Sequence, residues 1–98
     1  MNDAVPLESV RLPAGVELAR TTPEFTAASV PAGLLSAHQV ADGVWGRLRV
    51  LAGAVVYVVE VTGQRRTITA GGAQVIEPGL VHHVEPASDA RFVVEFHR

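Results

Sequence analysis

The hydrophobic positions of the chain fall in short runs that glycine and proline residues interrupt. The clearest pattern lies in VWGRLRVL (residues 44–51), where Leu48 and Val50 fall on one face of an extended chain and Arg47 and Arg49 fall on the other. This alternation predicts a strand with one buried face and one face toward solvent.

The next run, AVVYVVEV (residues 54–61), is β-branched and apolar on both faces, which is typical of a central strand. The residues TGQR then predict a hairpin turn into RTIT. In the last strand we expect Phe92, Val94 and Phe96 to share one face. The remaining expected strands are AQVIEP (73–78), VHHVEP (81–86) and RFVVEFH (91–97).

No segment shows a convincing helical period, and turn residues separate short strands along the whole chain. This organisation predicts an all-β fold, an antiparallel β-sandwich of the jelly-roll or small-barrel kind. We expect a single domain over residues 16–98, preceded by an N-terminal arm over residues 1–15 that carries Pro6 and Pro13.

The composition narrows the possible partners. The chain is 48% hydrophobic with 18% charged residues and a net charge of −2, and all its basic residues are arginines without a basic stripe. We therefore expect no nucleic-acid or membrane partner, and a homodimer that covers spare apolar surface. The absence of cysteine rules out disulfides and thiolate ligands and fits a cytoplasmic location. The first residues do not resemble a signal peptide, and no run is long enough to span a membrane.

The segment IEPGLVHHVEP places two histidines side by side. Because successive side chains of a strand point to opposite faces, His82 and His83 cannot easily bind one ion from a regular strand. If His82 faces inward with Val84, His83 faces outward, unless a bulge breaks the alternation. His82 is therefore the candidate for the interior, and His83 the alternative.

If a metal ion binds in the interior through His82 and a second histidine, three further residues are candidates for a third ligand. Glu77 lies directly before Pro78, while Glu95 and His97 share the strand face opposite the phenylalanine stripe. If that stripe is core, Glu95 points outward; if it packs at a dimer interface, Glu95 points into the cavity and completes a site of two histidines and one carboxylate. The periodicity does not choose between these alternatives. No nucleophile with a partner base is visible, so no catalytic residue is assigned.

Four segments in order resemble one known family: TPEFTAASVPAGLLSAH, GVWGRLRVLAG, VIEPGLVHHVEP and ARFVVEFHR. Over residues 17–98 the chain is similar to the small cupin-like domain of the tellurite-resistance protein B family, in a stand-alone form without the methyltransferase domain. The resemblance implies a cupin β-sandwich. The residues that carry it are Thr22, Pro23, Phe25, Pro31, His38, Gly43, Trp45, Gly53, Glu77, Pro78, His82, Glu95 and Phe96.

In cupins generally the interior holds a divalent metal, so the resemblance implies that His38 and His82 bind Zn, Ni, Fe or Cu. The first cupin motif is incomplete here, because Val40 stands at its second histidine and Gly46 or Trp45 near its glutamate. Ala41 replaces a basic residue that relatives often carry.

Two classes of function follow. The first is a metal-binding cupin linked to tellurite, other oxyanions or oxidative stress, or to metal-dependent chemistry on a small molecule. The second is a non-catalytic ligand-binding, sensor or structural dimer module with an eroded metal site. Methyl transfer is not expected, since the chain has no Gly-rich strand-to-helix turn for a nucleotide-type cofactor.

Overall fold

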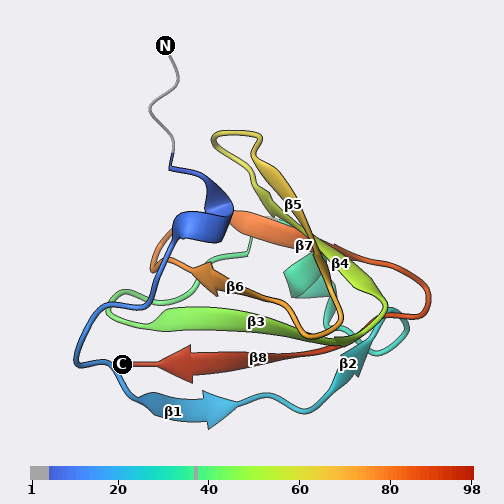
Figure 1. The fold of residues 1–98 in the computed structure, drawn as a ribbon, viewed down its shortest axis with the longest axis horizontal. Coiled ribbons are helices and arrows are strands. Elements are labelled where there is room, and N and C mark those ends of the chain that lie inside the picture. Colours follow the sequence, from blue (N-terminus) through green and yellow to red (C-terminus); the bar gives the residue numbers. More distant parts are fainter. Residues whose placement is uncertain (1–4, 37) are drawn as a thin grey trace.

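The structure of the protein, a computed structural model, describes residues 5–36 and 38–98. Two antiparallel sheets pack face to face as a small β-sandwich, which confirms the all-β fold predicted from the sequence (Figure 1). Sheet A contains β1 (Leu18–Thr21), β2 (Phe25–Thr26), β3 (Trp45–Ala52), β6 (Ala73–Ile76) and β8 (Arg91–His97). Sheet B contains β4 (Ala54–Val59), β5 (Arg65–Thr69) and β7 (His82–Pro86). Two 3-10 helices, η1 (Leu7–Ser9) and η2 (Ala32–Leu35), lie outside the sheets.

The order of strands in sheet A is β1-β8-β3-β6, and β2 pairs with β8 beyond the end of β1. The order in sheet B is β5-β4-β7. The last strand of the chain, β8, therefore pairs with β1 and β2, which lie near the N-terminus. Contacts between distant segments close the fold.

The alternation in β3 sets its two faces as predicted. Leu48 and Val50 are fully buried between the sheets, whereas Arg47 and Arg49 lie on the outer face of sheet A. In β4 the inward-facing Tyr57 is fully buried, and the outward-facing Val58 is also buried, as expected for the central strand of sheet B.

The phenylalanine stripe of β8 is core. Phe92 and Val94 are buried between the sheets, and Phe96 packs against the same cluster. Phe25 of β2 meets Phe92 edge to face, with ring centroids 5.8 Å apart. Of the two arrangements that the sequence left open for β8, the structure has the one in which Glu95 and His97 lie on the other face.

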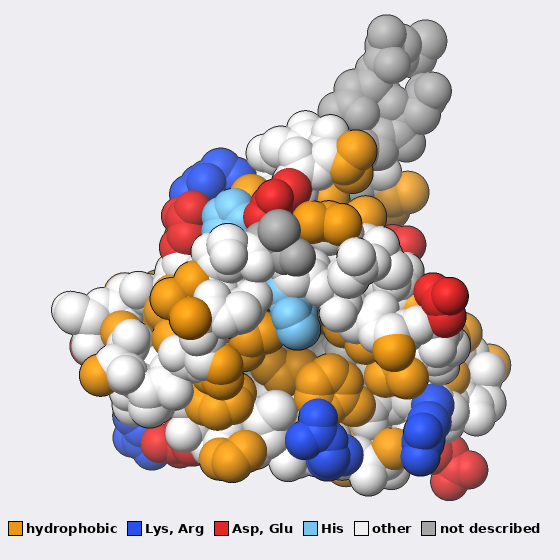
Figure 2. Space-filling model, turned by 180° about the vertical axis from the view of Figure 1, so that it is seen from behind, with side chains coloured by type: hydrophobic (Ala, Val, Ile, Leu, Met, Phe, Trp, Pro, Cys, Tyr) orange, Lys and Arg blue, Asp and Glu red, His pale blue; other side chains and the backbone are white. Residues whose placement is uncertain are grey.

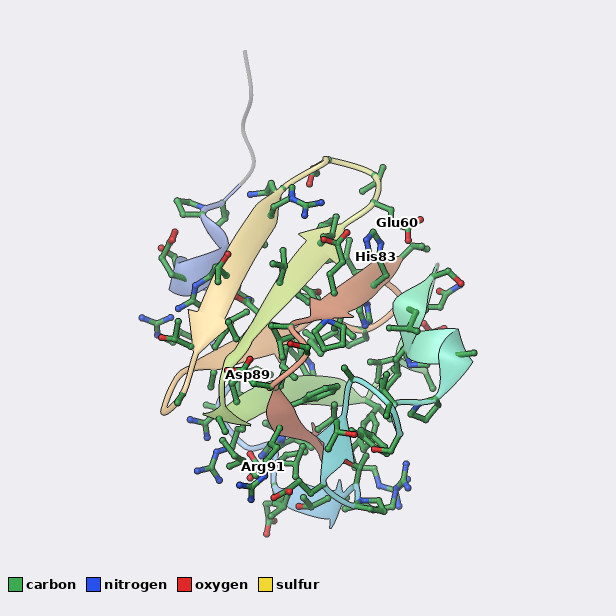
Figure 3. All side chains as sticks on the ribbon, turned by 90° about the vertical axis from the view of Figure 1, so that its right-hand side faces the viewer. Glu60, His83, Asp89 and Arg91 are labelled. Carbon is green, nitrogen blue, oxygen red and sulfur yellow. The ribbon has the colours of Figure 1, made fainter. Side chains whose placement is uncertain are left out.

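Gly53 carries the chain from β3 in sheet A to β4 in sheet B. Its backbone has φ +64, and a Cβ atom there would lie 2.6 Å from Asp89 Oδ1 and 2.9 Å from the backbone carbon of Asp89. Asp89 lies in the turn before β8, two residues before Arg91 (Figure 3). Arg91 is ion-paired with Glu24 at 2.8 Å. Only glycine fits this crossing between the sheets.

Part of the segment that the sequence predicts as an N-terminal arm packs onto the sandwich. Leu7 of η1 is buried in the core cluster, and its carbonyl accepts a hydrogen bond of 3.0 Å from Gln74 Nε2 on β6. Gln64 Nε2 donates to the carbonyl of Val5 at 2.9 Å. No helix within the described residues is long and apolar enough to cross a membrane.

Candidate functional site

A pocket of about 300 Å³ opens between the two sheets. Figure 2 shows this face as a hollow with hydrophobic side chains around it, a histidine beside it and arginine side chains along its rim. Its interior walls are the core side chains of β3, β6, β7 and β8, and its mouth is formed by segments before β3. The lining residues are Arg20, Thr22, Pro23, Phe25, Pro31, Gly33, Leu34, His38, Val40, Leu48, Ile76, His82, Val84, Phe92, Val94 and Phe96.

His38 and His82 meet in this pocket although they are distant in the sequence. Their backbones form an isolated antiparallel bridge, with His38 N donating to His82 O at 2.7 Å and His82 N donating to His38 O at 2.8 Å. The two rings are perpendicular, with centroids 5.4 Å apart. The structure therefore brings together the two histidines that the family resemblance pairs.

His82 is a neutral, oriented imidazole. The side chain is 1% exposed, and burial lowers its pKa, mainly by penalising the charged ring. Its Nδ1 lies 2.9 Å from the carbonyl oxygen of Leu80, so Nδ1 carries the proton and Nε2 keeps a lone pair. The ring of Tyr57 lies 5.3 Å away. The Tyr57 hydroxyl is buried without a hydrogen-bond partner among the described residues, and burial raises its pKa.

His83 faces the other side of sheet B. Its Nδ1 lies 2.8 Å from Glu60 Oε2, and its Nε2 lies 3.0 Å from Glu85 Oε2 (Figure 3). Hydrogen bonds to Glu85 and then to Glu60 raise the pKa of His83. Glu85 is further paired with Arg65 at 2.6 Å. His83 thus belongs to a surface network and does not line the pocket.

Glu95 is also held away from the histidine pair. Its carboxylate pairs with Arg49 at 3.2 Å and with Arg47 at 3.8 Å on the outer face of sheet A, while its neighbours Val94 and Phe96 line the pocket. His97 shares that outer face, and its Nδ1 has no hydrogen-bond partner within residues 5–36 and 38–98. Strand alternation places both outside the pocket.

The part of the chain that the structure describes contains no group of three or more His, Asp or Glu side chains that could hold a metal ion. Glu77, the remaining candidate, is exposed and does not line the pocket. Val40 contributes an apolar side chain to the pocket wall, and a Cβ atom at Gly46 would lie 3.2 Å from Ile76 Cβ. The positions that would supply further ligands in a cupin therefore supply none, so the residues present do not fit a three-ligand metal centre.

Residues 20–94 match the TehB-like domain family. The chain belongs to this family. A structure of a protein from Escherichia coli strain K12 is similar, with 28% sequence identity, a TM-score of 0.84, and coverage of 91% of this chain and 96% of that one. TehB from Haemophilus influenzae has the same fold with a TM-score of 0.74 at 24% identity, over 84% of this chain and 31% of that protein. The curated proteins contain no match.

The match confirms the TehB-like family that the sequence motifs indicated. Many of the motif residues share one location in the structure. Seven of them line the pocket, although they come from five separate segments: Thr22, Pro23, Phe25, Pro31, His38, His82 and Phe96. The motif residues therefore describe a pocket as well as a fold.

One residue at the mouth of the pocket was not identified from the sequence. Arg20 of β1 lies over the ring of Phe96, with its guanidinium carbon 4.8 Å from the ring centroid. The pairing of β1 with β8 creates this contact between the two ends of the TehB-like domain. A single arginine in a short polar strand carries no local signal of such a partner.

Proposed function

We propose that this TehB-like domain binds a small, largely apolar molecule in the pocket between its sheets. The observation that carries the proposal is the composition of the pocket wall, which is apolar except for Thr22 and Arg20 near the mouth and the paired His38 and His82. Ligand pockets of folded proteins typically combine an apolar wall with a few oriented polar groups.

The pocket has the size and the polarity for such a ligand. Its volume of about 300 Å³ is at the lower end of the range for small-molecule sites. His82, neutral and fixed by its bond to Leu80, supports this assignment because its Nε2 can accept a hydrogen bond from a ligand hydroxyl or amine. The proposal assigns binding and leaves any reaction unassigned.

An NMR titration tests the proposal with 1-hexanol as the probe. We expect the backbone amides of pocket residues to shift, and we expect Val94→Trp, which fills the pocket from β8, to abolish the shifts. Val61→Trp is the matched control, since Val61 is 78% exposed and does not line the pocket. Equal binding by wild type and Val94→Trp would exclude the pocket as the binding site.

A divalent metal at His38 and His82 is the second candidate. The observation in its favour is the bond from His82 Nδ1 to a backbone carbonyl, because metal-binding histidines are commonly oriented in this way through the nitrogen that does not bind the ion. With two protein ligands we expect weak binding of Zn²⁺, Ni²⁺, Fe²⁺ or Cu²⁺. Titration of wild type and of His38→Ala/His82→Ala tests this, and equal affinity in both would exclude it.

Membership of the TehB-like family supports a proposed role in resistance to tellurite or a related oxyanion stress in the cytoplasm. Growth of a tellurite-sensitive host on potassium tellurite tests this role, with wild type compared to His38→Ala/His82→Ala.

We also propose a homodimer, which the exposed Leu18 and Leu51 on sheet A support. Light scattering would give the molar mass, and a monomer at high concentration would exclude the dimer.

A further inference from the structure

The pocket continues at its mouth into a second hollow of about 440 Å³. Arg20, His38, Val40 and Phe96 line both spaces, and Arg98 lines the outer one. Arg20 therefore lies at the entrance where the two hollows meet, and Arg98 adds a second guanidinium to the outer one. The charge at this entrance decides which ligands suit the site.

Arg20 is held at the entrance by its neighbours. In the register of β1 and β8 it lies opposite Phe96, and its guanidinium carbon lies 4.8 Å from the centre of that ring. A guanidinium over an aromatic face is oriented by the cation–π interaction and keeps its N–H groups for another partner. Phe96 thus both lines the pocket and positions the cation beside it.

The arginines at the entrance differ from most others in the protein. Arg47, Arg49, Arg65 and Arg91 each pair with a carboxylate within 4 Å. Arg20 and Arg98 form no ion pair and donate no side-chain hydrogen bond within the described ranges 5–36 and 38–98. In the space-filling view, arginine side chains lie along the edge of the apolar hollow (Figure 2). Guanidinium groups without a carboxylate partner are ready to bind an anion.

We propose that the ligand of this site is an organic monoanion with an apolar body, such as a medium-chain or aromatic carboxylate. The body lies against the partly exposed side chains of Phe25, Leu34 and Phe96 in the pocket, and the carboxylate lies at the mouth with Arg20 and Arg98. The charge belongs at the mouth because an ionised group is strongly disfavoured inside an apolar wall without a partner. This inference rests on the proposed function and adds the chemical class of the ligand.

Three probes of equal chain length test it: hexanoate, 1-hexanol and hexylamine. We expect hexanoate to bind wild-type protein at least about tenfold more tightly than 1-hexanol, and hexylamine to bind most weakly. Arg20→Gln should remove the preference, so that hexanoate and 1-hexanol bind this variant with similar affinity. Arg65→Gln is the control, because Arg65 is exposed and lies outside both hollows. Affinities come from calorimetry or from amide shifts, and thermal melting verifies that each variant is folded.

The outcomes separate this inference from the proposed function. Equal affinity of wild type for hexanoate and 1-hexanol would overturn the anion preference while the proposed binding pocket stands. No binding of any probe would overturn both. If inorganic phosphate bound as tightly as hexanoate, the claim that the ligand has an apolar body would be wrong. If Arg20→Gln does not fold, Arg98→Gln and the salt dependence decide: hexanoate affinity must fall in that variant and with rising salt, and an unchanged affinity in both counts against the inference.

Discussion

His82 and His83 are neighbours in β7, yet their rings occupy opposite faces of sheet B and have opposite pKa shifts. His82 lies in the pocket with its ring 5.3 Å from that of Tyr57, and burial lowers its pKa. His83 lies between Glu60 and Glu85, at 2.8 Å and 3.0 Å, and its hydrogen bonds with them raise its pKa. One step along a strand therefore separates a buried imidazole, whose pKa is lowered, from a surface imidazole, whose pKa is raised.

The first prediction concerns His83 and the pH dependence of stability. Because its pKa is raised in the folded state, protonated His83 stabilises the fold fully below its unfolded pKa of about 6.5, and this contribution is lost as the pH rises through the folded pKa. We expect His83→Gln to be less stable than wild type near pH 6 and to approach it at higher pH. Urea unfolding across this range measures the difference, and a gap that widens with pH would contradict the assignment.

The second prediction concerns His82, for which the sign is opposite. Its lowered pKa means that the unfolded chain takes up a proton more readily, so stability is complete above about pH 6.5 and is lost as the pH falls through the folded pKa. His82→Phe should remove this acid-dependent loss. It should also cost about 1–3 kcal/mol at neutral pH, since the Leu80 carbonyl loses its donor.

The NMR titration of the imidazole protons checks both histidines directly. We expect one resonance to titrate below the ordinary histidine pKa and one above it, with His83→Gln assigning the second. Reversed assignments would show that the orientation of the two rings on β7 is wrong.

Strand alternation made much of this predictable from the sequence. It placed Leu48 and Val50 inside, and it separated His82 from His83 before any contact was known. Alternation does not choose the inner face of β8, because the stripe that contains Phe96 could pack either in the core or at a dimer interface. The ion pairs from Arg47 and Arg49 on β3 decide that question, and they depend on the register between β3 and β8.

Contacts between distant segments were the least predictable part of the site. Arg20 meets Phe96 only because β1 pairs with β8, and the position of His38 depends on its bridge to His82. The prolines around Leu7 predict an arm, although Leu7 is 7% exposed and packs in the core. The alternation of hydrophobic and polar residues predicts which face of a strand is buried, but it does not predict which strand pairs with it.

The third prediction uses two glycines to separate backbone strain from steric conflict. Gly53 and Gly63 both have positive φ, but a Cβ atom at Gly63 meets nothing within 4 Å, whereas one at Gly53 lies 2.9 Å from the backbone of Asp89. We expect Gly63→Ala to cost about 1 kcal/mol and Gly53→Ala about 3 kcal/mol or more. Chemical denaturation measures both, and equal costs would show that the contact between Gly53 and Asp89 is not close.

The fourth prediction adds a third histidine to the pocket. His38 and Val40 are two residues apart and both line the pocket, so a histidine at position 40 would project toward the same space as His38. A third imidazole beside His38 and His82 would complete the usual number of protein ligands for a catalytic zinc ion. We expect Val40→His to bind Zn²⁺ at least about tenfold more tightly than wild type, measured by competition with a chelating dye.

The control for Val40→His is the double variant Val40→His/His82→Ala, which has the same number of pocket histidines as wild type and should lose the gain. A gain that survives in the double variant would place the ion elsewhere, since His82 would then not be a ligand. No gain at all would mean that the side chain at position 40 and the two imidazoles cannot reach one ion. The backbone of the pocket would then hold the three side chains too far apart to bind one ion, because adding the third histidine would not be enough to build a site.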